Sequence, residues 1–566
     1  MKRILAVATL ALALAGCDAA VLSGGGDSDT ALDIPEVGEG DISQETMVEL
    51  TRQMSSDEFE GRMPGTEGGR MTVELLTERF EAAGLEPGNN GSWTQDVPLV
   101  EITGSDYAPL SITGGEADGM AFDYGDDWVA VSYRETPRTR INNSELVFVG
   151  YGINAPERGW NDYEGIDMEG KTAVILVNDP DFGAEDLEGP FNGKAMTYYG
   201  RWTYKYEEAA RQGAAAALII HESEPASYGW NVVESSWSGP QGYPQRGENA
   251  PPTTKMNGWI QNAVAEQIFE SAGQDLDALK EAAREKDFTP VALGLNASTS
   301  FANESREYVS QNVIGILPGA ERPDEYVMHT AHWDHLGRCK PADDGDDICN
   351  GAVDNATGTA ALVALAEAHA KAGAADRSLV FLAVTAEEQG LLGSSYYAQN
   401  PVFPLDQTVG GVNMDAFLIA GPSRDVTVVG PGKSQLDQFL EAALEADGRV
   451  STANPNPEAG YYYRSDHFPF AKQGVPMLYI DGGEDLIEGG REAGAAVAAD
   501  YRDNRYHGPK DEFNEDWDWS GVMADLQLYY RLGRMMAMST SWPNWVEGDE
   551  FRAIRDESCA ATYAGC

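Results

Sequence analysis

The sequence predicts an α/β fold: a mixed, mostly parallel central sheet with helices on both faces, joined to an inserted β-rich domain. From Asn312 onward, apolar runs of strand length alternate with helical patterns, which is typical of sheets covered on both faces. Between about residues 97 and 149, strand-like segments dominate instead. The length of 566 residues corresponds to about two to four folding units. A hydrophobic content of 42% is enough to fill their cores.

The first half of the chain begins with two helical patterns. Ser43–Met54 and Thr66–Ala83 both place apolar residues at helical spacing, so each predicts an amphipathic helix. After the strand-rich segment, Lys171–Val177 and Ala214–Ile220 read as buried strands, and Tyr204–Gln212 between them reads as a helix. This part is therefore expected to fold around its own sheet.

The second half contains the strongest strand and helix signals. The expected strands are Val313–Leu317, Tyr326–Thr330, Ser378–Thr385, Thr408–Asn413, Asp425–Val429 and Pro476–Ile480, and the expected helices are Thr357–Lys371, Lys433–Ala446 and Val522–Met538. In open α/β sheets the functional groups lie at the carboxyl ends of the strands. The residues that follow these strands are therefore the candidates for chemistry.

The charge of the chain excludes one class of partner. Asp and Glu number 92 against 39 Lys and Arg, which gives a formal net charge of −53. A protein that binds nucleic acid needs a dense basic surface to neutralise phosphates. We therefore expect no nucleic-acid partner and an acidic, solvated surface.

The N-terminal residues predict export. Lys2 and Arg3 precede the apolar run Ile4–Ala15, which is too short for a permanent membrane span and reads as a cleavable signal over residues 1–17. The ending Leu14-Ala15-Gly16-Cys17 resembles a bacterial lipobox. That resemblance implies a lipid on Cys17, a membrane anchor, and a place in the periplasm or cell envelope. The Gly-, Ser- and Asp-rich residues 18–42 are expected to form a flexible tether.

The remaining cysteines predict disulfides. Without Cys17 the chain has Cys339, Cys349, Cys559 and Cys566, and an oxidising compartment allows them to pair in three ways. The short spacings favour Cys339 with Cys349 and Cys559 with Cys566. Their spacing does not fit a structural zinc site.

Several predicted strands end in residues that can bind metal. His332 follows the strand Tyr326–Thr330, and Asp334 is positioned to orient its imidazole ring. Asp354 lies at the start of a helix, where a carboxylate most often only caps the helix. The next strand ends in the adjacent acids Glu387 and Glu388, which are costly near a core unless a cation or a proton lies between them.

Two further candidates complete the set. Asp415 follows the apolar strand Thr408–Asn413, and His507 lies in a loop where it has no evident packing role. Each residue alone is more simply explained as structural. Together, two histidines and three carboxylates are too many for one tetrahedral zinc and suit two zinc ions that share a bridging carboxylate. Such a pair is typical of hydrolases of the aminopeptidase type.

The order and context of these residues resemble the co-catalytic di-zinc aminopeptidase family, whose relatives include aminopeptidase Y and glutamate carboxypeptidases. The resemblance implies a zinc-exopeptidase fold that binds two Zn²⁺ per chain. By position it implies that His332 and Asp415 bind one zinc, Glu388 and His507 bind the other, Asp354 bridges both, and Glu387 is the general base. It also implies a cis peptide bond after Asp354.

The resemblance extends beyond the ligands. Tyr462, ahead of Ser465-Asp466-His467, has the offset of a tyrosine that stabilises the oxyanion, although it could equally pack the pocket wall. Residues 141–295 resemble a protease-associated domain. The remaining ranges are then 43–140 as the N-terminal part of the peptidase domain, 296–545 as its catalytic core, and 546–566 as a C-terminal tail.

These features predict an exported zinc aminopeptidase acting on peptides. A carboxypeptidase or dipeptidase of the same family is the alternative, and a cation placed to hold a terminal carboxylate, such as Arg464, would favour it. Glutaminyl cyclases fit less well, because they work with one zinc. A non-catalytic relative, as in transferrin receptors, would be marked by lost ligands, and all the ligand positions are filled here.

Overall fold

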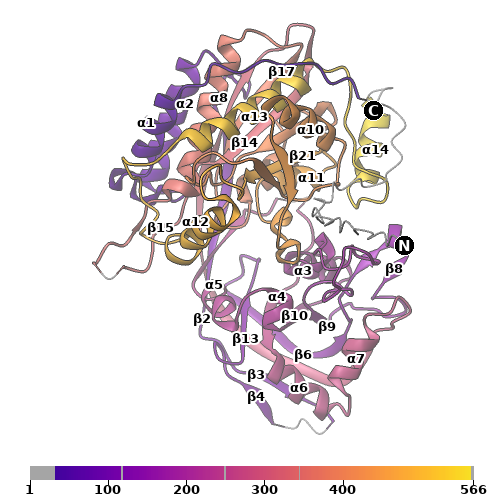
Figure 1. Cartoon of the computed structure of the whole chain (residues 1–566). Helices are drawn as coiled ribbons and strands as arrows, with labels where there is room; N and C mark the ends of the chain where they lie inside the picture. The colour runs from indigo at the N-terminus through magenta and orange to yellow at the C-terminus, as the bar shows by residue number, and fades with distance from the viewer. Residues whose placement is uncertain (1–31, 116–118, 248–249, 343, 563–566) are drawn as a thin grey trace, which may run out of the picture. The chain divides into compact units, whose positions relative to one another are not determined.

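In the computed structural model of the chain, residues 32–115, 119–247, 250–342 and 344–562 are described. The central sheet of the second half has four parallel strands in its middle, in the order β17, β14, β18 and β21 (Figure 1). Their bounds are Arg377–Val384, Arg322–His332, Thr408–Asn413 and Met477–Gly482. Two antiparallel strands flank them. Strand β13, Val291–Leu317, lies beside β17, and strand β19, Asp425–Val428, lies beside β21. The predicted mixed, mostly parallel sheet is confirmed.

The sheet is completed at both edges. On one side β2, Thr94–Ser105, and the short β1, Glu86–Pro87, pair antiparallel with β13. On the other side β20, Val450–Ala453, pairs parallel with β19. The carboxyl ends of the four parallel strands meet at one edge of the sheet, so the residues that follow them are brought together.

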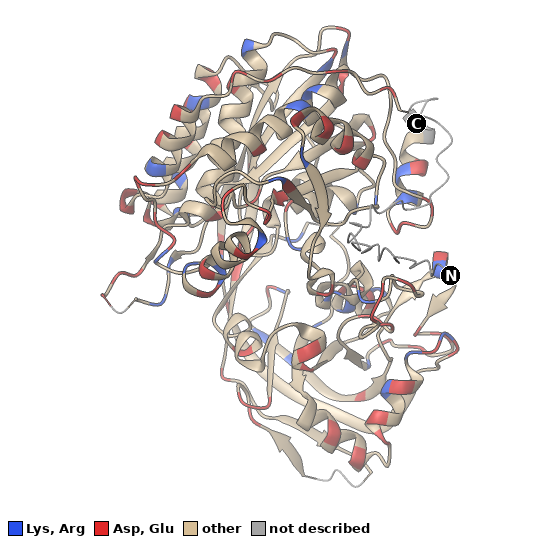
Figure 2. Cartoon of the chain, viewed as in Figure 1, with Lys and Arg blue, Asp and Glu red and all other residues tan. Residues whose placement is uncertain are grey.

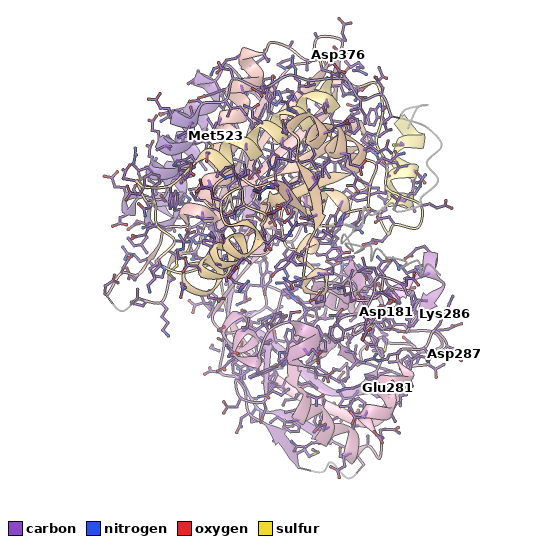
Figure 3. The ribbon with its side chains drawn as sticks, in the orientation of Figure 1. Asp181, Glu281, Lys286, Asp287, Asp376 and Met523 are labelled. Carbon is purple, nitrogen blue, oxygen red and sulfur yellow. A yellow bond between two sulfur atoms is a disulfide. The ribbon has the colours of Figure 1, made fainter. Side chains whose placement is uncertain are left out.

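Helices cover both faces of this sheet, as predicted. One face packs against α1, α2, α8, α10 and α13, which span Gln44–Met54, Glu67–Ala82, Gly358–Lys371, Leu436–Asp447 and Ser520–Met538 (Figure 1). The other packs against α9, Leu392–Gln399, and α11, His467–Ala471. Successive strand residues alternate between the faces: Val327 lies in the first core and Met328 in the second. Asp376 and Met523, labelled in Figure 3, mark the start of β17 and of α13.

A second sheet fills the inserted region, and its strands run in the order β5, β12, β10, β9, β6, β13, β3 and β4. In chain order, β3 is Leu110–Thr113, β4 Met120–Phe122, β5 Trp128–Val131, β6 Arg138–Phe148, β9 Thr172–Leu176, β10 Ala216–His221 and β12 Met256–Gln261. Its helices are α3 Trp202–Arg211, α4 Ser223–Ala226, α5 Trp230–Ser236, α6 Asn262–Ser271 and α7 Leu276–Ala282. Asp181 and Glu281 in Figure 3 belong to this region. The long strand β13 takes part in both sheets.

The pairing changes the expected extent of the inserted region. Strands β3 and β5 lie before residue 141, yet they pair with β13 and β12 because their apolar residues complete the same core. The region therefore begins earlier than the expected boundary. Its identification as a protease-associated domain stays a prediction.

Both ends of the described chain pack on the central sheet. Leu32, Ile34 and Val37 lie against the core, so the part of the expected tether from residue 32 to 42 is docked, and residues 18–31 lie outside the description. The expected C-terminal tail contains α14, Arg552–Thr562, whose buried Arg555 donates to the carbonyls of Thr408 and Val409. Both corrections have one physical reason: even short segments gain stability when they cover the core with buried residues.

Three smaller features complete the description. α12, Gly490–Asn504, precedes the loop that carries His507. Short strand pairs join β7, Asn154–Ala155, with β8, Trp160–Asn161, and β15, Gly337–Arg338, with β16, Ile348–Cys349. The helices in the described part of the chain lack the length and apolar character needed to cross a bilayer.

The predicted disulfide between Cys339 and Cys349 is confirmed and closes a loop beside the strand ends. Cys566 lies outside the described residues, so its pairing with Cys559 stays a prediction. The signal segment and Cys17 also lie outside them.

Candidate metal centre

The strand ends bring His332, Asp354 and Asp415 together. His332 is the last residue of β14, and Asp415 follows β18, its parallel neighbour. The His332 Nε2 atom lies 3.1 Å from Asp415 Oδ1 and 3.3 Å from Asp354 Oδ1. One ligand atom from each residue falls within 4.8 Å of the others, which is the spacing of a metal site.

A second group shares Asp354. His335, Asp354 and Glu388 also place ligand atoms within 4.8 Å of one another. His507 adds a fourth side chain: its Nε2 atom lies 3.0 Å from Glu388 Oε2 and 3.3 Å from Asp354 Oδ2. The two Asp354 oxygens thus face different groups, as a bridging carboxylate requires. The structure therefore brings together all five residues that the sequence assigned to metal.

The backbone around Asp354 is held by several hydrogen bonds. The peptide bond between Asp354 and Asn355 is cis, as the family resemblance implied. The buried Asp511 carboxylate accepts from the amides of Val353 and Asp354. The Asn355 side chain accepts from Ala416 N, directly after Asp415. These contacts fix one metal-binding residue relative to another.

Glu387 lies among the carboxylates without belonging to either ligand group. It follows β17 after Ala386, whose φ of 56° turns the chain sharply where the strand stops. Burial, followed by the charges of Asp415 and Glu388, raises the pKa of Glu387 well above its ordinary value, although His332 opposes this shift. A raised pKa is what a carboxyl group needs in order to accept and release a proton near neutral pH.

The carboxylates and histidines of the site shift one another's pKa values. Burial would lower the pKa of His332, but Asp415, Glu387 and Asp354 raise it well above its ordinary value. Burial would raise the pKa of Asp354, but hydrogen bonds from His332 and His507 hold it well below the usual range. The grouped carboxylates therefore favour positive charge beside them, which bound cations would supply.

The donor set fits zinc. Two imidazole and three carboxylate side chains are ordinary zinc ligands, and the shared Asp354 accounts for an odd number of ligands around two ions. The Nε2 atom of the buried His335 has no hydrogen-bond partner among the described residues. The arrangement can hold two divalent cations over one carboxylate, with a further carboxylate beside them for proton transfer.

Asp334 acts differently from what the sequence suggested. His332 Nδ1 lies 3.2 Å from the main-chain carbonyl of Asp334 and 3.9 Å from its carboxylate. The carboxylate instead accepts a hydrogen bond from Glu387 N at 3.1 Å. Asp334 therefore positions both the histidine ring and the backbone of the expected base.

Tyr462 is not brought to the ligands by any contact found in the described residues. Its ring lies 4.6 Å from that of His467 and 5.1 Å from Lys433 Nζ, and burial with Asp549 and Glu550 raises its pKa. Its buried hydroxyl has no hydrogen-bond partner among the described residues, so its catalytic role stays a prediction beside the wall-packing one.

Tyr506 is one of several tyrosines near the metal ligands. Its ring stacks on that of His507 at 3.8 Å, and 49% of the residue is exposed. No sequence pattern distinguished it from its neighbours. It lies directly before a ligand, and that position is the one signal that could have identified it.

Two more residues were missed from the sequence. His335 reaches Glu388 Oε1 with its Nδ1 atom at 2.5 Å, although it lies only three residues after the predicted ligand His332. Arg62 is fully buried and donates to the carbonyls of Met54, Trp333, Asn350 and Gly351. An isolated arginine far from the motif gives no sequence signal for such a role.

Taken together, an α/β sheet with His, Asp and Glu side chains grouped at its strand ends, where they could hold metal, fits a metallohydrolase site. Residues 312–531 match the model of Peptidase family M28. This part of the chain is therefore a domain of Peptidase family M28, and it contains every ligand named above.

Three curated relatives illustrate the similarity. The chain is 32% identical to mouse "Aminopeptidase NAALADL1" over 128 residues, 22% of this chain and 16% of that protein. It is 29% identical to a Caenorhabditis elegans "Glutamate carboxypeptidase 2 homolog" over 34% of this chain and 24% of that one. It is 27% identical to Bacillus subtilis "Aminopeptidase YwaD" over 33% and 38%. The matched segments thus span well under half of these relatives.

Among solved structures, an aminopeptidase from Aneurinibacillus sp. strain AM-1 superposes with a TM-score of 0.46 at 18% identity. The superposition covers 88% of this chain and 95% of that one.

Proposed function

We propose that this protein is a zinc-dependent aminopeptidase that releases N-terminal residues from peptides. The observation that carries the proposal is the shared Asp354, which faces His332 and Asp415 on one side and Glu388 and His507 on the other. The family match of residues 312–531 and the relatives named aminopeptidases support it.

Each residue has a role in this proposal. His332 and Asp415 would hold one zinc, Glu388 and His507 the other, and Asp354 both. Zinc held by these residues would supply a water of lowered pKa and would polarise a peptide carbonyl.

Glu387 is placed to take a proton from the water and return it to the departing amine. Asp334 holds the Glu387 backbone for this task. Tyr462, whose buried hydroxyl lacks a hydrogen-bond partner among the described residues, would stabilise the developing oxyanion, and Tyr506, which stacks on His507, is the second candidate.

The proposal also includes export. The Leu14-Ala15-Gly16-Cys17 pattern supports a lipid anchor at Cys17, and the disulfide between Cys339 and Cys349 supports an oxidising compartment. Mass spectrometry of the mature N-terminus after expression in a bacterial host tests the anchor, with Cys17→Ala as its control. A mature protein that begins elsewhere than Cys17 contradicts it.

A substrate panel tests the activity. Aminoacyl chromogenic substrates and their N-blocked counterparts are assayed with and without a chelator. We expect cleavage of free-amine substrates alone, abolished by the chelator and restored by zinc. Preferential cleavage of blocked peptides at the carboxyl end supports the carboxypeptidase alternative instead.

Glu387→Gln tests the base. We expect turnover to fall about 100- to 10,000-fold, the usual contribution of a general base, while bound zinc stays at about two ions per chain. Full activity in this variant contradicts the assignment. A loss of zinc together with activity shows that Glu387 supports the ligands instead.

A further inference from the structure

The loop that carries Glu387 and Glu388 is closed at its base by one buried side chain. Strand β17 leads into this loop, and helix α9 follows it. Thr385 N donates to Asn312 Oδ1 at 3.0 Å, and Asn312 Nδ2 donates to Gly393 O at 3.0 Å. One amide group therefore binds the backbone on both sides of the two acids. We call this pair of hydrogen bonds the Asn312 clamp.

The two ends of the loop also contact each other directly. Gly393 N donates to Thr385 O at 2.9 Å, which places the two backbone segments side by side. A Cβ atom on Gly393 would lie 2.3 Å from Thr385 O and 2.6 Å from Asn312 Oδ1, so no side chain fits at this position. The base of the loop is thus closely packed around the Asn312 amide.

Strand β13 presents a row of polar side chains to this loop. Tyr308, Ser310 and Asn312 are alternate residues of the strand and therefore lie on the same face. The Ser310 hydroxyl lies 2.6 Å from that of Thr385, and Tyr308 OH donates to Gln389 Oε1 at 2.8 Å. Three successive residues of one strand face thus contact the loop before the two acids, after them and at its base.

The Asn312 amide is fixed by partners on more than one element. Its orientation follows from the clamp, because Thr385 N can only donate and Gly393 O can only accept. Its Nδ2 atom also donates to Gln95 Oε1 at 3.1 Å, and Gln95 Nε2 donates to Asn400 O at 2.8 Å. Asn312 is fully buried, so water cannot replace these partners when they are lost.

The Asn312 clamp is uncharged in a strongly acidic chain. The chain has 92 acidic residues, and Asp and Glu are spread over its helices and loops (Figure 2). Glu387 and Glu388 are adjacent like charges near other carboxylates, and a further buried negative charge beside them would be costly. An amide fixes the backbone of the loop without adding that charge.

We propose that Asn312 is a positioning residue for the reaction, which holds Glu387 in place beside the metal ligands through the Asn312 clamp. This inference rests on the proposed function, because Glu387 acts as a base only if the metal centre hydrolyses peptides. Asn312 acts through the backbone of the loop and, being fully buried, cannot contact a substrate. A displacement of a reacting group by about 1 Å can lower a rate about 100-fold.

Hydrogen exchange tests the Asn312 clamp without substrate. Exchange of the backbone amides in residues 385–393 is measured by mass spectrometry on the full chain as purified, for the wild type and Asn312→Ala. The control Asn257→Ala removes another buried asparagine, which lies on β12 of the second sheet and accepts from Thr254. We expect exchange in residues 385–393 to rise at least about 10-fold in Asn312→Ala and to stay unchanged in Asn257→Ala. Equal protection of this segment in Asn312→Ala and the wild type overturns the inference.

Kinetics at saturating zinc tests the effect on Glu387. We expect Asn312→Ala to lower kcat about 10- to 100-fold and to keep KM within about twofold of the wild type, while Asn257→Ala keeps both. In the Glu387→Gln background, Asn312→Ala should lower the residual kcat by less than about threefold, because the base that it positions is already gone. An unchanged kcat in Asn312→Ala, or the same fold-loss in both backgrounds, overturns the inference.

The two experiments separate this inference from the proposed function. If the wild type cleaves no peptide, the proposed function fails, and the exchange of residues 385–393 still decides whether Asn312 holds the loop. If the wild type is active and Asn257→Ala loses as much kcat as Asn312→Ala, the loss reflects general destabilisation and the inference is wrong.

Discussion

Arg62 offers the sharpest test of how the fold organises the metal centre. Its guanidinium is fully buried and donates four hydrogen bonds at 2.6–2.9 Å. Trp333 O lies in the loop of His332 and His335, while Asn350 O and Gly351 O precede Asp354. One side chain therefore ties together the two loops that carry ligands of both groups.

The magnitude follows from these bonds. Burial lowers the pKa of Arg62 to about 10, against the opposing charges of Asp511 and Asp334, so the group stays charged at neutral pH. Hydrogen bonds to a charged group contribute about 1.5–3 kcal/mol each. Four of them sum to at least about 6 kcal/mol, but loop carbonyls regain water once the side chain is gone. We therefore expect Arg62→Met to lose about 3–5 kcal/mol of unfolding free energy.

The assay must separate stability from site geometry. Urea unfolding gives the change in stability, and competition with a chromogenic chelator gives zinc affinity under conditions where each variant is folded. We expect zinc affinity to fall about 10- to 100-fold, as for other groups that orient ligands. Arg62→Lys should recover part of the stability and little of the affinity, because an ammonium cannot reach all four carbonyls.

The matched control is Arg52→Gln, which removes an exposed arginine paired with Glu515. Exposed ion pairs contribute about 0–1 kcal/mol, so this variant should match the wild type. If Arg62→Met is destabilised but binds zinc with unchanged affinity, the loops are organised without Arg62 and the reasoning is wrong.

Three further predictions follow from the same structure. His335→Ala should weaken binding of one zinc per chain about 10- to 100-fold and leave the other in place, because His335 contacts only the group of Glu388. A zinc titration that shows equal loss of both ions contradicts this prediction. Burial lowers the pKa of His329 to about 3 and that of His369 well below its ordinary value, so both are neutral when folded and gain protons on unfolding below about pH 6.5. Their stability contribution is present above that pH and is lost as the pH falls toward 3. His369→Phe should therefore reduce the loss of unfolding free energy between pH 6 and 4.5 by about 2 kcal/mol in urea titrations, and parallel curves for variant and wild type refute the assignment. Replacing both Cys339 and Cys349 by Ser should lower the free energy of unfolding by about 3 kcal/mol, because the disulfide restricts the entropy of the unfolded loop between cysteines 10 residues apart. Zinc content should not change, and an unaltered urea midpoint contradicts the prediction.

The central sheet was predictable because its local signals agree with its packing. Strands β14, β17 and β18 are apolar runs buried on both faces, and their pattern alone indicates parallel strands between helices. The ligands were predictable for the same reason: His332, Glu388 and Asp415 each follow such a strand. Each of these residues alone has a simpler structural explanation, and it was the whole set at successive strand ends that indicated metal.

The parts that the sequence did not reveal depend on contacts between distant segments. Arg62 lies 271 residues before Trp333, whose carbonyl it binds, and nothing near it in the sequence marks the partnership. Residues 32–42 lack periodicity, yet Asp33 accepts a hydrogen bond from Thr540 N at 2.9 Å and holds the segment on the core. Strand pairing likewise extends the inserted region to residues before 141. Strand β13 belongs to both sheets, and the register of its pairing, which local composition does not reveal, determines its partners.

The inserted region bears directly on the chemistry. The metal ligands lie in residues 332–507, and they explain hydrolysis but do not select a substrate. Arg201 comes from the inserted region and Arg464 from the peptidase domain, and the contacts of Tyr198 with Tyr463 and Lys472 hold their segments together. Lys472→Met removes the hydrogen bond to Tyr198 and should loosen this contact while leaving zinc binding intact, because neither residue belongs to the metal-binding groups.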